Sequence, residues 1–375
     1  MSKINLIPRV TLKELRVLIP LIAAQDENDE YITPIIQSEP GCGKTSLLKM
    51  IAEDNGDKWR KPGDKYPEDK YDYIYVDCPV KDMSDIGMVI PNHDTKTLEY
   101  YVASLFCLDS PKPKVILLDE FMKAPKLLQV IFTRLMLERM VGDNPLTHGS
   151  VVFGTSNNQG DGVGDTMLAH AGNRVCIIEM QKPDVPTWLE YATTKGISRI
   201  IRAFVAMHPK VLRSYRDDGQ EDNEYIFHPT KPVLSFCSPR SLEKANVIIK
   251  NMGKFSEGVL TAALAGTIGA SAAKQMETFI SMEKSVTDVK DILKDPKNIH
   301  VPKEIAAQLM IMFQALDVVT TQDELSSFMH FVNRIESEEV QSIFFSLVLS
   351  NSRTVRIAKN NEEVKAWAKN NHQLF

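Results

Sequence analysis

The sequence predicts an α/β fold with a central parallel sheet, followed by an all-α part. A glycine-rich run lies between a strand-like and a helix-like segment within residues 31–52, and a continuous apolar run ends in two acids at residues 114–120. After Pro183, helical spacing replaces the strand-like runs. Because a strand buried on both faces reads as an unbroken apolar run, these features are typical of a parallel sheet covered by helices.

The glycine-rich run has the residues of a loop that binds phosphate groups. In order, it consists of Ser38, Glu39, Pro40, Gly41, Cys42, Gly43, Lys44, Thr45 and Ser46. Glycine permits backbone conformations that other residues avoid, and the N-terminus of the following helix attracts anions. Lys44 is expected to reach the β- and γ-phosphates of a nucleotide, and the Thr45 hydroxyl to bind Mg²⁺. We therefore expect ATP and Mg²⁺ as cofactors, since no guanine-recognition run of the N-K-x-D type is evident.

One position departs from the usual phosphate-loop pattern, because Ser38 stands where the first glycine is expected. Serine is small and polar, so we expect it to be tolerated there. The alternative is a glycine-rich turn before an ordinary helix. The strand-like segment 31–37 and the helix-like segment 45–52 favour the phosphate loop, which requires a strand before it and a helix after it.

The apolar run at residues 114–120 predicts a second part of the same site. It ends in Asp119 and Glu120, the pattern called Walker B. Carboxylates at the carboxyl end of a parallel strand can meet phosphates at the edge of the sheet. Asp119 is the expected partner of hydrated Mg²⁺, and Glu120 is placed to polarise a water molecule for attack on the γ-phosphate. This pairing favours hydrolysis. The alternative is a buried strand followed by solvated acids that begin a helix.

A third strand is predicted at residues 150–158, and it ends in small polar residues. It would lie beside the other two strands at the same edge of the sheet. Asn157 could then hold the attacking water. Asparagine-rich strand ends are also common in plain turns, so the weight of this segment comes from its place in the order of motifs.

These segments together resemble the MoxR-type AAA+ ATPases, the clade with an insertion in helix 2. Residues 119–125 and 132–139 resemble the Walker B segment and its helix, and 154–158 resembles sensor 1 with Asn157 in the polar position. Residues 171–175 are similar to the arginine-finger segment, and 237–241 to sensor 2. Residues 77–79 with 85–87 resemble the insertion. The resemblance covers roughly residues 8–280. It departs at Ser38, at Lys123, where the family usually carries Arg, and at Asn158, where it commonly has Pro.

The resemblance implies an ATP-hydrolysing motor that assembles as a ring, a hexamer. Arg174 would reach into the neighbouring subunit's site, where an arginine can raise the rate by about 10³ to 10⁵. Arg240 would act within its own subunit and report the nucleotide state to a helical lid. The alternative for both arginines is a surface ion pair, the commoner fate of an arginine. Relatives commonly work with a von Willebrand factor A domain protein, which implies a protein client or such a partner.

Three regions are expected along the chain: an AAA+ nucleotide-binding α/β domain at 1–185, a helical lid with sensor 2 at 186–285, and a helical C-terminal extension at 286–375. Apolar spacing predicts helices within 188–191, 197–207, 305–316, 324–335 and 340–349. Residues 258–273 are expected to form a close-packed helix pair. Residues 59–72 read as a surface loop before a strand at 73–77.

Composition favours a cytoplasmic protein without a membrane segment. The N-terminus shows no secretory signal, and the longest small-apolar stretch is too short to span a bilayer. Five cysteines without paired spacing indicate reduced thiols. The net charge of −5 gives no basic footprint for nucleic acid.

Three functions stay open at this stage. The first is a chaperone-like remodelling motor that acts on a protein partner, and we favour it. The second is a nucleic-acid-directed AAA+ motor, which would need a basic pore. The third is a nucleotide-gated assembly scaffold. Glu120 speaks against the scaffold, because a scaffold has no need of a water-activating carboxylate, and the acidic net charge speaks against the second.

Overall fold

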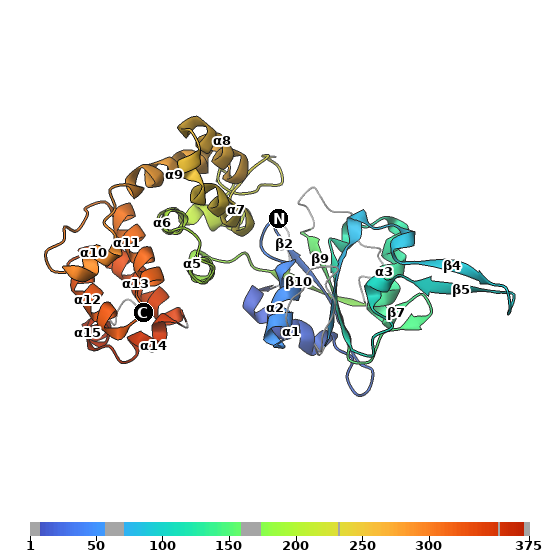
Figure 1. The fold of residues 1–375 in the computed structure, drawn as a ribbon. Helices are drawn as coiled ribbons and strands as arrows, with labels where there is room; N and C mark the ends of the chain where they lie inside the picture. Colours follow the sequence, from blue (N-terminus) through green and yellow to red (C-terminus); the bar gives the residue numbers. More distant parts are fainter. Residues whose placement is uncertain (1–7, 57–70, 159–173, 232, 352, 371–375) are drawn as a thin grey trace. The chain divides into compact units, whose positions relative to one another are not determined.

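A computed structural model shows two compact units, residues 1–182 and 183–375 (Figure 1). The structure describes residues 8–56, 71–158, 174–231, 233–351 and 353–370. The first unit is an α/β unit and the second is built from helices. The predicted fold class, an α/β core with a central parallel sheet followed by an all-α part, is therefore confirmed.

The first unit contains a six-stranded sheet in the order β1-β10-β2-β9-β6-β3, and all its strand pairs are parallel. The strands are β1 Arg9–Val10, β2 Thr33–Ser38, β3 Asp72–Asp77, β6 Lys114–Asp119, β9 Val151–Asn157 and β10 Val175–Met180. Four of these strands, β2, β3, β6 and β9, confirm segments that the sequence predicts. Because all run the same way, the ends of β2, β9, β6 and β3 meet at one edge of the sheet.

Helices cover both faces of this sheet. The helices α1 Leu12–Ala23 and α2 Ser46–Asp54 share one apolar core with the sheet, and α3 Lys126–Glu138 shares the other. Along β6, Val115 and Leu117 belong to the first core, whereas Ile116 and Leu118 belong to the second. This alternation explains why the run is apolar at every position: the strand is buried on both sides.

A β-hairpin occupies the region that resembles the helix-2 insertion. It consists of β4 Gly87–Asn92 and β5 Thr97–Val102, paired antiparallel, and is drawn as an extended arm in Figure 1. Two short 3-10 turns, Cys78–Val80 and Met83–Asp85, lead into it from β3. The sequence analysis did not predict this hairpin. A second, two-residue hairpin joins β7 Met140–Val141 to β8 Asn144–Pro145.

The second unit is helical throughout its described elements. Its α-helices are α5 Val185–Thr194, α6 Arg199–Met207, α7 Pro239–Lys250, α8 Glu257–Ile268, α9 Ala270–Glu283, α10 Val289–Lys294, α11 Ile305–Val318, α12 Gln322–Val332, α13 Glu338–Ser350, α14 Thr354–Ala358 and α15 Glu362–Asn370. The predicted helices are present, and so is the predicted pair at 258–273, formed by α8 and α9. The short α14 and α15 were not predicted.

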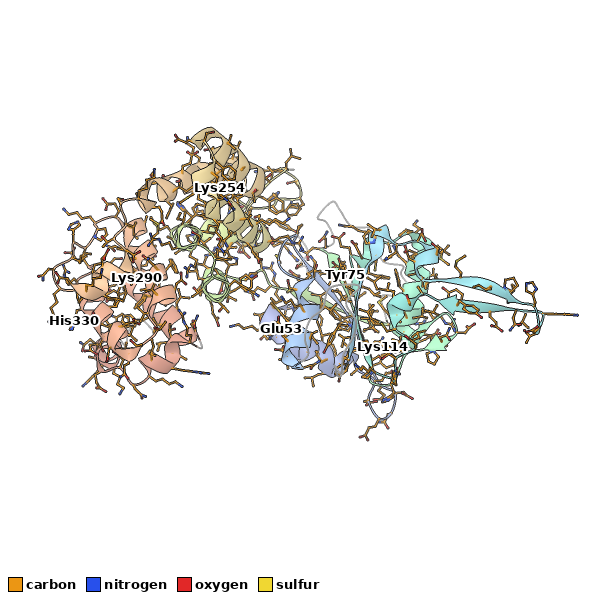
Figure 2. All side chains as sticks on the ribbon, in the orientation of Figure 1. Glu53, Tyr75, Lys114, Lys254, Lys290 and His330 are labelled. Carbon is orange, nitrogen blue, oxygen red and sulfur yellow. The ribbon has the colours of Figure 1, made fainter. Side chains whose placement is uncertain are left out.

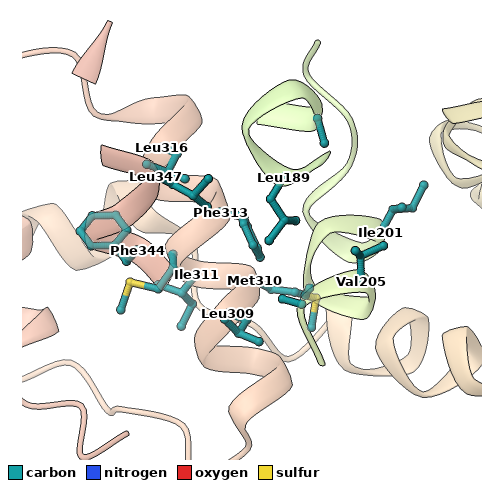
Figure 3. Close-up of a cluster of buried hydrophobic side chains, with 14 of the residues drawn as sticks. Leu189, Ile201, Val205, Leu309, Met310, Ile311, Phe313, Leu316, Phe344 and Leu347 are labelled. Carbon is teal, nitrogen blue, oxygen red and sulfur yellow. The ribbon is translucent and has the colours of Figure 1, made fainter. Parts of the chain in front are cut away.

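Helix α11 is the centre of this unit, because it is buried on almost every side. Figure 3 shows Met310 and Phe313 of α11 between Leu189 and Val205 on one side and Phe344 on the other. A single apolar core extends in this way from α5 to α15. The proposed boundaries at 185 and 285 stay predictions, since this core contains residues from both sides of 285.

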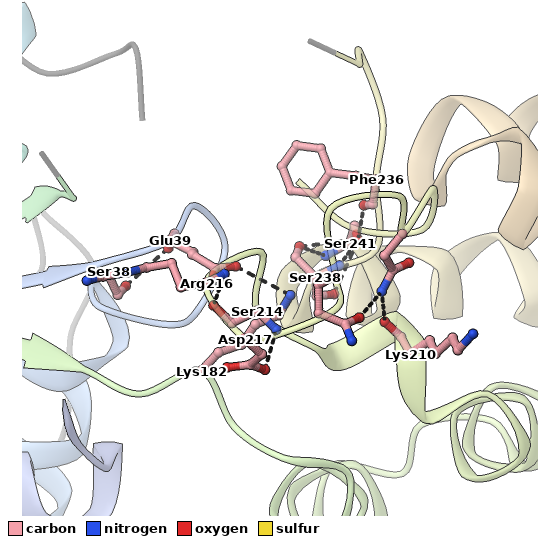
Figure 4. Close-up of polar contacts among 12 residues, drawn as sticks. Ser38, Glu39, Lys182, Lys210, Ser214, Arg216, Asp217, Phe236, Ser238 and Ser241 are labelled. Atoms are coloured by element: carbon pink, nitrogen blue, oxygen red, sulfur yellow. Dashed lines mark hydrogen bonds and ion pairs between the residues drawn. The ribbon is translucent and has the colours of Figure 1, made fainter. Parts of the chain in front are cut away.

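The start of α7 shows how local chemistry sets a helix end. Ser238 caps the helix: its Oγ accepts from the backbone N–H of Ser241 at 3.1 Å, and its own N–H donates to Ser241 Oγ at 2.8 Å (Figure 4). Pro239 follows as the first helical residue, where its missing N–H costs nothing.

In the part of the chain that the structure describes, none of the helices has both the length and the apolar character needed to cross a bilayer.

Candidate functional site: the carboxyl edge of the sheet

The predicted phosphate loop joins β2 to α2. Gly41 and Gly43 have φ of 79° and 99°, in the left-handed region that side-chain-bearing residues disfavour. The helix begins directly after the loop, and Thr45 at its start makes no side-chain cap to the helix. The loop thus leads into the N-terminus of α2, and helix N-termini favour anions such as phosphate. This geometry fits a phosphate group.

Lys44 folds back across the loop. Its ammonium is buried and donates to the backbone oxygens of Ser38 at 2.8 Å and Glu39 at 3.2 Å, and to the Ser38 hydroxyl at 3.1 Å. It also donates to Oδ1 of Asn157 at 3.2 Å. The serine that replaces the expected glycine thus provides an acceptor for the lysine. The departure from the pattern changes the lysine's contacts without removing the cation.

Asn157 lies beside this loop because β9 pairs with β2, and Ser38 and Asn157 are direct neighbours across the two strands. The structure therefore brings the third predicted segment to the phosphate loop. The side chain of Asn157, at the end of this segment, accepts a hydrogen bond from Lys44. The sequence predicts that this residue holds the attacking water. The role of Asn157 stays a prediction.

Asp119, the last residue of β6, completes the site. Its side chain is 7% exposed, and its Oδ2 accepts hydrogen bonds from Thr45 Oγ1 and Tyr75 OH, both at 3.0 Å. Its Oδ1 accepts from Thr155 Oγ1. The two residues predicted to hold Mg²⁺, Thr45 and Asp119, are thus in direct contact although 74 positions separate them.

This arrangement fits Mg²⁺ and a nucleotide. A threonine hydroxyl oxygen keeps two lone pairs while its proton points at a carboxylate, so Thr45 can donate to Asp119 and still face a metal. Mg²⁺ is usually held by one or two carboxylates together with water and substrate phosphates. When bound, the metal would neutralise charge on the phosphate oxygens. Lys44, Thr45 and Asp119 are the residues of this chain that would hold the pair.

Glu120 follows Asp119 in a left-handed conformation with φ of 52°. Its N–H donates to Thr155 Oγ1 at 3.1 Å, and its Oε2 lies 2.7 Å from Lys123 Nζ. The side chain of Glu120 is 39% exposed and that of Lys123 27%. The predicted base therefore has a cationic partner from its own chain.

A third acid, Asp77, stands at this edge. It is the cross-strand neighbour of Asp119, because β3 pairs with β6 in register. Burial raises the pKa of Asp77, and the charges of Asp119 and Glu120 raise it further. Asp77 was predicted as the last residue of a strand and as part of the resembled insertion, and its place at that strand end was a signal for the site.

Two buried groups fill the other side of the loop. Burial raises the pKa of the Cys42 thiol to about 11, so at neutral pH it is protonated. This agrees with a small filler in the loop. Glu39 forms an ion pair with Lys182, with 3.6 Å between Nζ and Oε2, and both side chains are 5% exposed. Lys182, which the sequence analysis missed, ties the end of the first unit to the loop.

The structure does not bring Arg174, the predicted finger residue, into this cluster. Arg174 is exposed and immediately precedes β10. Because Val175 pairs with Thr33 at the start of β2, Arg174 lies about six residues of strand, roughly 20 Å, from the phosphate-loop end of β2. Residues 171–173 of the predicted finger segment lie outside the described residues. Arg240 is exposed on the first turn of α7, and its role stays a prediction.

Comparisons with known proteins add fold-level likenesses. No family model matches the sequence, and the search of curated proteins gives no match. Similar solved structures include a variant of RuvB from Thermotoga maritima, with 16% identity, 84% of this chain and 86% of that chain covered, and a TM-score of 0.37. NtrX from Brucella abortus in complex with ATP has 10% identity, covers 99% and 70%, and has a TM-score of 0.37. A protein of Cytophaga hutchinsonii named as a candidate ATPase has 17% identity, covers 73% and 90%, and has a TM-score of 0.32. Similarity at this level assigns neither a family nor a function.

Proposed function

We propose that this chain is a Mg²⁺-dependent ATPase of the AAA+ superfamily, of MoxR type, that works as a ring-shaped remodelling motor on a protein partner. The observation that carries the ATPase is the hydrogen bond of 3.0 Å between Thr45 and Asp119. It joins the phosphate loop to the acidic strand end, and these are the two groups that a metal-bound triphosphate requires.

Hydrolysis is favoured because a second acid follows the first. Glu120 lies at the same edge of the sheet, partly exposed, and its carboxylate can accept a proton from a water molecule that attacks the γ-phosphate. Lys44 provides the compact cation for the phosphates. Asn157, in contact with Lys44, is the residue that would orient the water.

Ring assembly is part of the proposal. A finger residue that serves a neighbouring subunit should be exposed and remote from its own phosphate loop. Arg174 meets both conditions, as its position before β10 shows. The MoxR subtype and a hexamer rest on the sequence resemblance, as does a partner with a von Willebrand factor A domain.

A protein client is supported by the exposed hairpin. Several apolar side chains of the hairpin are exposed to solvent, and large exposed apolar patches mark interaction surfaces. They are Met88, Val89, Ile90, Leu98 and Tyr101. A nucleic-acid track is the alternative, and the net charge of −5 does not favour it.

Two variants test the proposal. Lys44→Ala should lose ATP binding, because the phosphates lose their cation, whereas Glu120→Gln should bind ATP, keep the assembled ring and lose turnover. Lys49→Ala and Glu53→Gln are matched controls on α2, since both side chains are exposed. Binding of a fluorescent ATP analogue, phosphate release and light scattering with and without ATP measure the three properties.

Native turnover by Glu120→Gln would show that the base is wrongly assigned. ATP binding by Lys44→Ala at the native affinity would remove the phosphate loop from the proposal. Turnover that rises with DNA and not with candidate protein partners would favour the nucleic-acid motor.

A further inference from the structure

The carboxylate of Asp119 is surrounded by hydroxyl groups. Thr45 Oγ1 and Tyr75 OH each donate to Oδ2 at 3.0 Å, and Thr155 Oγ1 donates to Oδ1. The three hydroxyls come from the phosphate loop, β3 and β9. Among the described residues, this carboxylate is therefore held by neutral donors from three separate segments, while it remains 7% exposed.

Thr155 also holds the neighbouring acid in place. Its Oγ1 accepts the N–H of Glu120 at 3.1 Å while its proton lies on Asp119. Glu120 has φ of 52°, a conformation that is uncommon for residues other than glycine and needs support from its surroundings. The side chain of Thr155 is fully buried. One hydroxyl thus fixes the direction of both acids.

The three hydroxyls occupy most of the hydrogen-bond acceptor positions of the Asp119 carboxylate. An ionised carboxylate has about four lone-pair positions. The bonds from Thr45 and Tyr75 take the two positions on Oδ2, and the bond from Thr155 takes one on Oδ1. One acceptor position remains, on Oδ1. A carboxylate held in this way has one orientation and one open place for a further donor or cation.

We propose that Tyr75 and Thr155 are positioning residues that hold Asp119 with a single acceptor position presented to Mg²⁺ or to one of its water ligands. This inference rests on the proposed function and gives a positioning role to Tyr75, outside the Walker and sensor motifs, and to Thr155, within the segment that resembles sensor 1. Groups that orient a metal-binding carboxylate typically change metal affinity by about 10-fold to 100-fold when they are removed.

Tyr75 is suited to this role by its position on β3. Because β3 pairs with β6 in register, its hydroxyl reaches Asp119 Oδ2 at 3.0 Å from the neighbouring strand. Figure 2 labels Tyr75 inside the α/β unit.

The same strand offers a matched control. Tyr73 is two residues earlier on β3, so its side chain leaves the sheet on the same side as that of Tyr75. Its hydroxyl accepts from Asn55 Nδ2 at 3.1 Å, and Asn55 is not part of the site. Tyr73→Phe removes a hydroxyl of the same kind from the same face of the same strand.

The experiment measures metal affinity separately from turnover. The full-length protein and its Tyr75→Phe, Tyr73→Phe, Thr155→Val and Thr155→Ser variants are saturated with a non-hydrolysable ATP analogue. Mn²⁺ is then titrated and followed by electron paramagnetic resonance, with competition by Mg²⁺. Affinity for the fluorescent analogue in EDTA is measured alongside, and circular dichroism confirms folding.

We expect Tyr75→Phe and Thr155→Val to bind Mn²⁺ about 10-fold more weakly, with unchanged affinity for the nucleotide in EDTA. Thr155→Ser keeps the hydroxyl and should restore the metal affinity, and Tyr73→Phe should match the unmodified protein. The inference is overturned if Tyr75→Phe binds Mn²⁺ as tightly as the unmodified protein, or if Tyr73→Phe weakens it equally. If the unmodified protein binds no nucleotide, the proposed function fails first, and the inference fails with it.

Discussion

Lys123 is paired with Glu120 on one short turn, with 2.7 Å between Nζ and Oε2. The turn Phe121–Lys123 is a 3-10 helix, which places residues three apart on the same side. In this structure Glu120, the proposed base, is therefore held by Lys123 of its own chain. Position 123 is where the resembled family usually has Arg.

The first prediction concerns this pair. Lys123→Met should leave ATP affinity unchanged and raise the turnover of the protein without partners several-fold, because a partly exposed ion pair worth about 1 kcal/mol no longer holds the Glu120 carboxylate against Lys123. Phosphate release and analogue binding measure the two effects. Lys126→Met, on the exposed first turn of α3, is the control. A drop in turnover would instead mean that Lys123 orients Glu120 for catalysis.

The second prediction concerns Arg174. Arg174→Ala should lower turnover by about 10³ or more with little change in ATP affinity, since a finger acts on the transition state. Mixing it with Lys44→Ala subunits should restore part of the activity, because the second variant contributes the arginine and the first the intact phosphate loop. Turnover is measured against the mixing ratio. A mixture no more active than the sum of its components would count against a shared site.

The third prediction concerns Asp77 and pH. Its pKa is raised above the ordinary 3.8 by burial and by Asp119 and Glu120. The folded state therefore binds more protons than the unfolded state just above pH 3.8, so this group makes the protein less stable as pH rises through that window. Asp77→Asn should be more stable at pH 7, by less than about 1 kcal/mol for a partly exposed side chain.

Urea unfolding at pH 7 and at pH 4 measures this difference, which should shrink at the lower pH as the acid becomes protonated. Asp94→Asn, in the exposed turn of the hairpin, is the control for loss of a charge elsewhere. If Asp77→Asn were less stable at pH 7, the favourable contacts of the Asp77 carboxylate would outweigh its repulsion by Asp119 and Glu120.

The fourth prediction concerns Gly269, which joins α8 to α9. Its φ is 90°, and a Cβ there would lie 2.9 Å from the backbone oxygen of Ser235. Gly269→Ala should cost about 1–3 kcal/mol, because side-chain-bearing residues avoid this conformation. Calorimetry of the full chain should show a lower transition temperature for the helical unit, by about 2–4 °C for each kcal/mol.

Gly266→Ala is the matched control three residues earlier. A Cβ there meets nothing within 4 Å, and the residue lies inside α8. Alanine favours a helix over glycine by about 0.5–1 kcal/mol, so this variant should be as stable as the unmodified protein or more so. Equal losses from both changes would contradict the assignment of strain to Gly269.

Much of the site could be predicted because its signals are local. The residues of the phosphate loop are contiguous, and Asp119 and Glu120 follow directly from a strand that is apolar at every position. In the structure Thr45 donates to Asp119, and Asn157 lies at the loop in contact with Lys44. These contacts follow from parallel pairing, which brings strand ends to one edge.

Other features could not be predicted, because they depend on contacts between distant segments. The hairpin Gly87–Val102 has mostly exposed strands and lacks the clear alternation of a half-buried sheet. In the sequence, Tyr75 is one of several tyrosines in and near β3. Only the register of β3 against β6 brings its hydroxyl within hydrogen-bond distance of Asp119. The continuous helical core likewise depends on how α11 packs with α6 and α13.

The chemistry of the site can be read from the sequence alone: two glycines where the backbone must turn left-handed, one lysine, one hydroxyl and two acids at a strand end. How those groups are held depends on the tertiary structure. It sets Asp119 among three hydroxyls and places Arg174 at the opposite end of the strands from the phosphate loop. The reason is physical: a loop's conformation depends on neighbouring residues, whereas the orientation of a side chain depends on strands that are adjacent in space and far apart in sequence.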